Sequence, residues 1–135
     1  MDDQMERVFI FGDMKKGFPD HDFLVNECHA IYLGSTAFRG GSLFLSNIVR
    51  VDGKVKGTPR MSNSSGMVTG ELYGVPEHSL CTVDAMVGGE RKQIMVDGKP
   101  GISHFSEPED WGEKNDCELI GDTYRPEHCY GPVAA

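Results

Sequence analysis

The sequence lacks any long apolar segment, and this absence limits where the protein can reside. A membrane-spanning helix needs about 20 consecutive apolar residues, and no apolar run of this chain approaches that length. The first residues, Met1 to Glu6, are acidic and polar, unlike the apolar centre of a secretion signal. We therefore expect a cytoplasmic protein that has no membrane as a partner.

Positive charge is also scarce. The 13 lysines and arginines are outnumbered by 21 aspartates and glutamates, which gives a formal net charge of −8. Proteins that hold nucleic acid polymers without sequence preference need an excess of basic side chains. We therefore expect no nucleic acid polymer as a partner. A small anionic ligand stays compatible with this composition, because the local charge of a pocket decides whether such a ligand binds.

No C-x-x-C pair occurs among the four cysteines, which are Cys28, Cys81, Cys117 and Cys129. In a chain without a secretion signal, such wide spacing favours reduced and mostly buried thiols. His128 and Cys129 are soft ligands that would need Cys117 or His104 to complete a zinc site, but adjacent residues chelate poorly on most backbones. The sequence therefore predicts no metal site and implies no cofactor.

What the chain does contain is the length and composition of one soluble domain. It has 135 residues, of which 39% are hydrophobic and 25% charged, and this is enough for a hydrophobic core. We expect a single domain over residues 1–135 with an acidic C-terminal extension at 106–135. Lys114 and Arg125 are the only lysine and arginine among the many acidic residues of this extension. We therefore interpret it as a solvated surface segment.

Short apolar or alternating runs predict several β-strands. These runs are 8–11, 30–33, 37–38, 43–45, 48–51, 67–75, 91–96 and, as the last strand, 102–105. Gly34 and the pair Gly40-Gly41 are expected to interrupt them. Asp52-Gly53 predicts a hairpin turn. Residues 57–66 are rich in Gly, Pro, Ser and Asn, which predicts an exposed loop placed to lie over a site.

One strong helical pattern lies between these strands. Pro76 suits the first position of a helix, and Glu77 favours the positive end of the helix dipole. Apolar residues at helical spacing then continue to Val87, and Gly88-Gly89 is a stop signal. A shorter helical turn is expected at 22–27. Strands alternating with one central helix predict an α+β fold, a small mixed β-barrel or curled sheet with one main helix.

A loop bracketed by Gly12 and Gly17 follows the first predicted strand. Glycine allows the backbone N–H groups to approach a ligand closely, and Lys15 and Lys16 add positive charge to the same loop. These features fit a cradle for an anion or a carboxylate. The same residues also fit a plain structural turn, which is the commoner fate of such a motif.

Several segments resemble the gamma-glutamylcyclotransferase-like (AIG2-like) family. The first is Phe9-Ile10-Phe11-Gly12-Asp13-Met14-Lys15-Lys16-Gly17 with Pro19-Asp20-His21, which is similar to that family's F-V-Y-G-T-L-K-R-G and P-N-H. Residues 30–34, 70–75 and 76–84 follow in the family's order, so the resemblance covers about residues 7–105. It implies the family's fold and its activity, which releases 5-oxoproline from γ-glutamyl amines. In the family, a Glu in the motif L-D-x-x-E-G is the general acid and base.

The chain departs from this family at the positions that build the site. The matching run Val83-Asp84-Ala85-Met86-Val87-Gly88 places Val87 where the catalytic Glu is expected. Valine neither accepts nor donates a proton. Phe11 replaces the usual Tyr, and Asp13 replaces a small hydroxyl residue. A carboxylate at Asp13 would repel a substrate carboxylate by on the order of 1 kcal/mol.

These departures lead to three hypotheses. The first is a small-molecule-binding protein without enzymatic activity, which sequesters an anionic or nucleotide-like ligand. Its ligand-binding residues would be Phe11, Gly12, Asp13, Met14, Lys15, Lys16, Gly17 and Val87. The second is an active gamma-glutamyl cyclotransferase that uses Glu90 as its base. The third is a structural or regulatory protein whose acidic tail contacts a partner. The sequence leaves the oligomeric state open, a homo-oligomer included.

Overall fold

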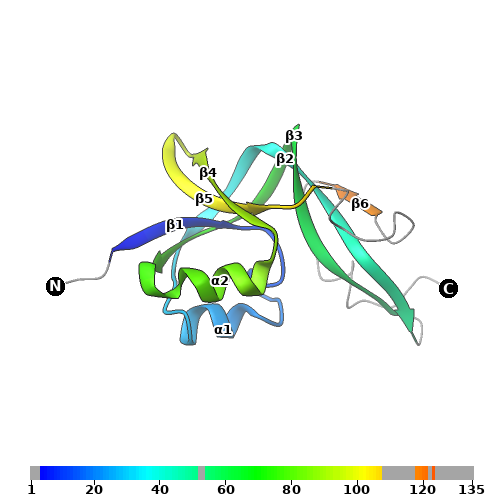
Figure 1. Ribbon diagram of the computed structural model, residues 1–135, viewed down its shortest axis with the longest axis horizontal. Coiled ribbons are helices and arrows are strands. Elements are labelled where there is room, and N and C mark those ends of the chain that lie inside the picture. The colour runs from blue at the N-terminus through cyan, green and yellow to red at the C-terminus, as the bar shows by residue number, and fades with distance from the viewer. Residues whose placement is uncertain (1–3, 52–53, 108–117, 122, 124–135) are drawn as a thin grey trace.

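A computed structural model of the protein describes residues 4–51, 54–107, 118–121 and 123. Its described strands form one sheet in the order β4-β5-β1-β3-β2-β6. The elements are β1 (Met5–Ile10), α1 (His21–Asn26), β2 (Ile31–Val51), β3 (Lys54–Pro76), the 3-10 turn η1 (Glu77–Ser79), α2 (Leu80–Val87), β4 (Glu90–Val96), β5 (Lys99–Phe105) and β6 (Glu118–Gly121). The sheet curls into a half-barrel with the helices on one side, below β1 in the view of Figure 1. The expected α+β fold with a mixed, curled sheet is confirmed.

The apolar half of strand β1, Val8 to Ile10, is buried on both faces, and it organises the core. Val8 and Ile10 are in one apolar cluster with Leu24 of α1 and Val83 of α2. Phe9 is in a second cluster on the other face of the sheet. Side chains of a strand alternate between the two faces, so an uninterrupted apolar run is what a strand between two cores requires. Burying each such side chain contributes about 1.5–3 kcal/mol.

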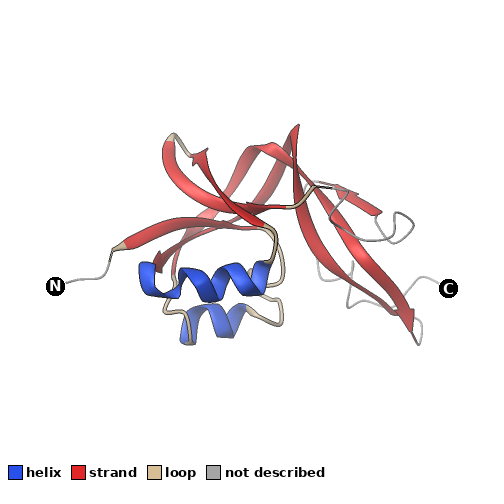
Figure 2. Ribbon diagram, viewed as in Figure 1, coloured by secondary structure: helices blue, strands red, loops and turns tan. Residues whose placement is uncertain are grey.

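β1 is also central in the hydrogen-bonded ladder. It pairs antiparallel with β3 and parallel with β5, which makes the sheet mixed. The main helix forms where the sequence predicts it, as η1 followed by α2, and it ends at Gly88 with a φ of 80°. The expected turn at 22–27 corresponds to α1. Figure 2 shows both helices as short segments beside a structure made mostly of strands.

The glycines at 34, 40 and 41 do not interrupt the second strand as expected. β2 continues through them, and its register with β3 shifts between Tyr32 and Gly34 and again between Arg39 and Gly41. Gly34 and Gly40 have φ values of 135° and 136°, a region that favours glycine. An irregularity of this kind bends a strand without ending it. The prediction of strand breaks was therefore wrong.

Residues 57–66 are also a strand, and the prediction of an exposed loop was wrong. They belong to β3, where Pro59 pairs with Leu45 and Asn63 with Gly41. Strand formation by Ser, Asn and Gly depends on the partner strand more than on intrinsic preference. The hairpin that Asp52-Gly53 predicts is present as the antiparallel pair of β2 and β3, although Asp52 and Gly53 themselves lie outside the described residues.

The C-terminal extension contains a strand that the sequence analysis missed. β6 pairs with Leu43–Leu45 of β2, so 102–105 is not the last strand. β6 is only Glu118–Gly121, too short for a convincing alternation, and the open edge of β2 supplies its partner. Trp111, Cys117, Tyr124 and Cys129 lie outside the described residues, as do the other residues at 108–117, 122 and 124–135.

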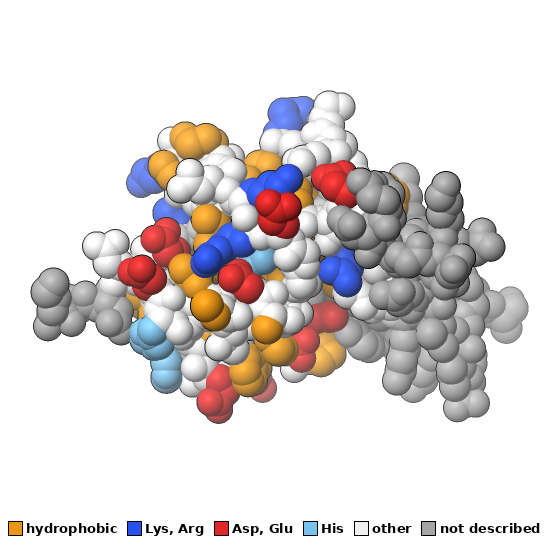
Figure 3. Space-filling view, viewed as in Figure 1, with side chains coloured by type: hydrophobic (Ala, Val, Ile, Leu, Met, Phe, Trp, Pro, Cys, Tyr) orange, Lys and Arg blue, Asp and Glu red, His pale blue; other side chains and the backbone are white. Residues whose placement is uncertain are grey.

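The described helices are all too short or too polar to cross a membrane. On the face of the molecule in Figure 3, acidic and basic side chains are interspersed among the described residues rather than gathered by sign.

We expect Gly12→Ala to destabilise the fold. A Cβ at Gly12 would lie 2.8 Å from Cγ of Pro59, because the loop after β1 passes directly over β3. Such overpacking costs about 1–3 kcal/mol, which urea denaturation would measure. The double variant Gly12→Ala/Pro59→Ala removes the atom in conflict and should recover part of that loss. Equal stability of wild type and Gly12→Ala would contradict this packing.

Candidate functional site

A pocket lies where the loop after β1 meets the C-terminal end of α2, and we call it the loop–helix pocket. Its wall comprises Ile10, Phe11, Gly12, Asp13, Met14, Asp20, Thr58, Pro59, Met86 and Val87. The structure therefore brings the glycine loop and Val87 together, although they are far apart in the sequence. The pocket has a volume of about 30 Å³, which is enough for one or two water molecules.

The loop of this pocket is held by hydrogen bonds to its own later residues. The backbone N–H of Asp20 donates to the carbonyl of Asp13 at 3.1 Å. The His21 ring, protonated at Nδ1, donates to the carbonyl of Met14 at 3.0 Å. The Pro-Asp-His segment thus folds back onto the glycine loop, and this explains why the two stretches occur together in the sequence.

The two lysines of the loop do not contribute to the wall of the loop–helix pocket. Lys15 is only 6% exposed, and its Nζ lies 5.1 Å from the centre of the Phe18 ring. Nζ of Lys16 lies 3.5 Å from the centre of the Tyr32 ring. Lys15, Lys16 and Gly17 are all absent from the wall of this pocket. The positive charge expected at the cradle is therefore placed on the other side of the loop.

Carboxylates take the place of these lysines in the pocket. Asp13 and Asp20 both contribute to the wall. Burial raises the pKa of the Asp20 carboxyl, and the nearby charge of Asp13 raises it further. Sequence reasoning selected Asp13 and expected the segment that contains Thr58 and Pro59 to lie over a site, but it missed Asp20 and Met86. The resemblance at Pro19-Asp20-His21 was a signal for Asp20, because that segment accompanies the loop.

Val87 closes the pocket at the end of α2. Its side chain is half-buried and packs against both apolar clusters. The chain then turns through Gly88 and Gly89, whose φ values are 80° and 75°. A Cβ on Gly89 would lie 2.6 Å from the carbonyl oxygen of Phe105. Two adjacent glycines are therefore needed to pass from the helix into β4.

Glu90 is on the far side of this turn. It is the first residue of β4, where it pairs with Phe105. It is exposed and lines a separate hollow together with Arg60 and Ser106. The loop–helix pocket has no contribution from Glu90.

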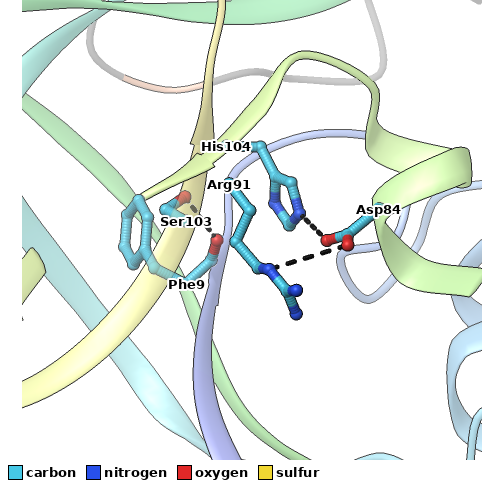
Figure 4. A network of polar contacts seen from close by, with 5 residues as sticks. All are labelled: Phe9, Asp84, Arg91, Ser103 and His104. Carbon is cyan, nitrogen blue, oxygen red and sulfur yellow. Dashed lines mark hydrogen bonds and ion pairs between the residues drawn. The ribbon is translucent and has the colours of Figure 1, made fainter. Parts of the chain in front are cut away.

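A polar contact network fixes α2 against the sheet (Figure 4). Nε2 of His104 in β5 lies 2.7 Å from Oδ1 of Asp84, and Nε of Arg91 in β4 lies 3.6 Å from Oδ2 of the same carboxylate. The hydroxyl of Ser103 donates to the carbonyl of Phe9 at 2.9 Å. Asp84 therefore holds the helix that carries Val87 against the sheet.

Cys28 is buried and Cys81 is exposed, and neither is in a disulfide. The prediction of buried, reduced thiols is therefore confirmed for Cys28, whereas the burial predicted for Cys81 was wrong. Within the described ranges, no three His, Cys, Asp or Glu side chains gather closely enough to hold a metal ion. His128 and Cys129 lie outside those ranges.

Known proteins similar to this chain include a characterised enzyme and solved structures. No family model matches the chain. It is 29% identical over 113 residues to the gamma-glutamylaminecyclotransferase of Mus musculus, covering 73% of each chain. A structure of an AIG2-like protein from Mus musculus superposes with a TM-score of 0.60 at 20% identity, covering 98% of this chain and 96% of that one.

A part of a larger enzyme has the same fold. The allophanate hydrolase of Kluyveromyces lactis matches with a TM-score of 0.65 at 20% identity over 87% of this chain. The chain spans only 19% of the length of that enzyme, so this match concerns the fold alone.

We expect acid to weaken the fold through His104. Burial lowers the pKa of His104. The hydrogen bond to Asp84 acts in the opposite direction, but burial is the larger effect and the pKa is lowered overall. The folded protein therefore keeps His104 neutral at a pH where the unfolded chain, with an ordinary pKa of about 6.5, already takes up a proton. The free energy of unfolding should fall as pH decreases below that value.

Denaturant unfolding at a series of pH values would measure this dependence, with His104→Gln as the comparison. The difference between wild type and His104→Gln isolates the histidine from the carboxylates that titrate nearby. Wild type should lose stability more steeply than the variant as the pH falls to about 5. The same slope in both proteins would show that His104 is not held neutral.

Proposed function

We propose that this chain, which belongs to the gamma-glutamylcyclotransferase-like family, binds a small molecule in the loop–helix pocket without catalysing cyclotransfer. The single observation that supports this proposal is the position of Val87. It occupies the end of α2 in the pocket wall, where the family resemblance requires the catalytic carboxylate.

The chemistry explains why this position decides activity. The α-amine of a γ-glutamyl group is mostly protonated at neutral pH, and only its free form attacks the γ-carbonyl. A carboxylate must take the proton and deliver it to the leaving amine. Val87 does neither, and Glu90 belongs to β4 and a different hollow.

The pocket wall still offers groups that recognise a ligand. The N–H groups of the loop around Gly12 are suited to an anionic or carboxylate group. Asp13 and Asp20 are suited to an amine, a hydroxyl or the edge of a nucleobase. A ligand that contacts both the N–H groups and the carboxylates must carry a hydrogen-bond donor next to its anionic group. A nucleotide-like or amino-acid-like molecule has this arrangement. Lys15 and Lys16 are not part of this recognition, because they lie outside the wall.

The present volume of about 30 Å³ requires the wall to move before such a ligand enters. The wall contains two methionines, Met86 of α2, which is 40% exposed, and Met14 of the loop, which is buried. Methionine side chains are unbranched and adaptable, so their rotation would enlarge the pocket without moving the sheet. A ligand bound in this way and not converted is withdrawn from solution, which is the sequestering function that we propose.

We expect the wild-type protein to release no 5-oxoproline from γ-glutamyl amines. Loss of a positioned general base costs about 10²- to 10⁴-fold in rate. Val87→Glu restores a carboxylate at the end of α2 and should therefore gain measurable turnover. Quantifying 5-oxoproline by mass spectrometry, with Val87→Gln as the matched neutral control, tests both expectations.

Two further variants separate the alternatives in the same assay. Turnover by wild type that Glu90→Gln abolishes would favour an active cyclotransferase with Glu90 as its base. Turnover that Asp20→Asn abolishes would instead assign the base to Asp20, whose raised pKa is suited to proton transfer. Either outcome would refute the proposal of a non-catalytic protein.

The pocket itself is tested by ligand binding. Native mass spectrometry of the protein purified from cells should reveal a co-purifying small molecule, which calorimetry can then titrate into variants. Asp13→Ala should weaken binding by about 1–3 kcal/mol, because a polar partner on the ligand loses its acceptor. Lys15→Ala and Lys16→Ala should leave the binding constant unchanged. A normal binding constant in Asp13→Ala combined with a lower melting temperature would show that Asp13 only supports the loop.

A further inference from the structure

A second hollow lies on the other side of the glycine loop, and we call it the Lys15–Glu71 hollow. Lys15, Ser35, Thr36, Thr69, Gly70 and Glu71 contribute to its wall, and its volume is about 420 Å³. It shares no wall residue with the loop–helix pocket. We propose that this hollow binds a small anion that also carries hydroxyl groups, such as a sugar phosphate.

Lys15 supplies the positive charge of this site. The residue is only 6% exposed, and lysine is rarely buried to this extent because its ammonium group loses hydration. Its Nζ lies 5.1 Å from the centre of the Phe18 ring, which is within the range of a cation–π contact. A positive charge at the wall of the hollow attracts an anion by the Coulomb interaction.

Glu71 supplies an oriented acceptor. Its Oε1 accepts the backbone N–H of Lys16 at 2.9 Å and the hydroxyl of Tyr73 at 2.7 Å. Burial and the hydrogen bond to Glu71 raise the pKa of Tyr73, so its hydroxyl stays a donor. These two donors hold the carboxylate in one place, where it can accept hydrogen bonds from ligand hydroxyl groups.

The sheet adds hydroxyl groups beside this carboxylate. Ser35 of β2 pairs directly with Glu71 of β3, so their side chains are on the same face, and Thr69 is two residues before Glu71 on that face. The hydroxyl of Tyr32 shares a hydrogen bond with Oγ of Ser35 at 2.9 Å. Nζ of Lys16 lies 3.5 Å from the Tyr32 ring centre, which places a second positive charge next to the hollow.

This combination selects the chemistry of the ligand. The wall has a cation, a carboxylate and several hydroxyl groups. A bare polyanion is repelled by Glu71. A molecule with one anionic group and several hydroxyl groups offers a partner both to the ammonium group of Lys15 and to the carboxylate of Glu71. This inference is separate from the proposed function, because it uses different residues.

Titration of isotope-labelled protein with ribose 5-phosphate tests the site directly. The backbone amide resonances of Gly70 and Glu71 should shift in a saturable manner, while those of Gly12 and Val87 should stay in place. Ribose and inorganic phosphate, titrated separately, should each bind about tenfold or more weakly. Shifts confined to Gly12 and Val87, or no shifts at millimolar ligand, would overturn the assignment.

Calorimetry with variants then tests the roles of the two charged residues. Lys15→Met keeps the length of the side chain and should weaken ribose 5-phosphate binding by about tenfold or more. Glu71→Gln should reduce the preference for ribose 5-phosphate over inorganic phosphate. Lys92→Met is the matched control, since it removes a lysine outside the hollow and should bind normally.

A melting-temperature measurement on each variant confirms that it is folded. Normal binding by a folded Lys15→Met protein, or an equal loss in Lys92→Met, would refute the proposal. Neither result depends on the ligand or activity of the loop–helix pocket.

Discussion

Burial of β1 on both faces is the constraint on which the rest of the structure depends. Val8 and Ile10 face the helices, while Phe9 faces the opposite core, so the strand has no freedom to shift by one residue without exposing apolar side chains. Its register with β3 fixes where the strand ends. Gly12 then passes so close to Pro59 that no Cβ fits. The loop is therefore positioned by the core and not by its own hydrogen bonds alone.

The end of α2 is positioned just as firmly from the other side. His104 and Arg91, on two strands of the sheet, hold the Asp84 carboxylate, and Gly88 and Gly89 turn the chain immediately after Val87. This turn sends Glu90 into β4 and away from the pocket. Val87 and Glu90 are thus close in the chain but line different hollows, because the backbone direction changes between them.

The glycine loop lies between two hollows that differ in their charged side chains. One side has Asp13 and Asp20 in a small pocket, and the other has Lys15 at the wall of a larger hollow. Successive side chains in a tight loop point in different directions, so neighbouring charges do not have to act on one ligand. The family resemblance describes the first side. The second side follows from the pairing of β2 with β3 and from the burial of Lys15.

The sequence by itself determined the features that depend on local pattern. A continuous apolar run predicted the doubly buried strand, and helical spacing ended by two glycines predicted α2 and the place of Val87 at its end. Only the tertiary structure decided the directions of Lys15 and Lys16, the approach of Asp20 to Asp13, and the strands at 57–66 and 118–121. These features depend on partners that are distant in the chain. Segments with a weak intrinsic preference for strand become strands because they pair with β2. Packing against distant residues decides on which side of the loop each charged side chain lies.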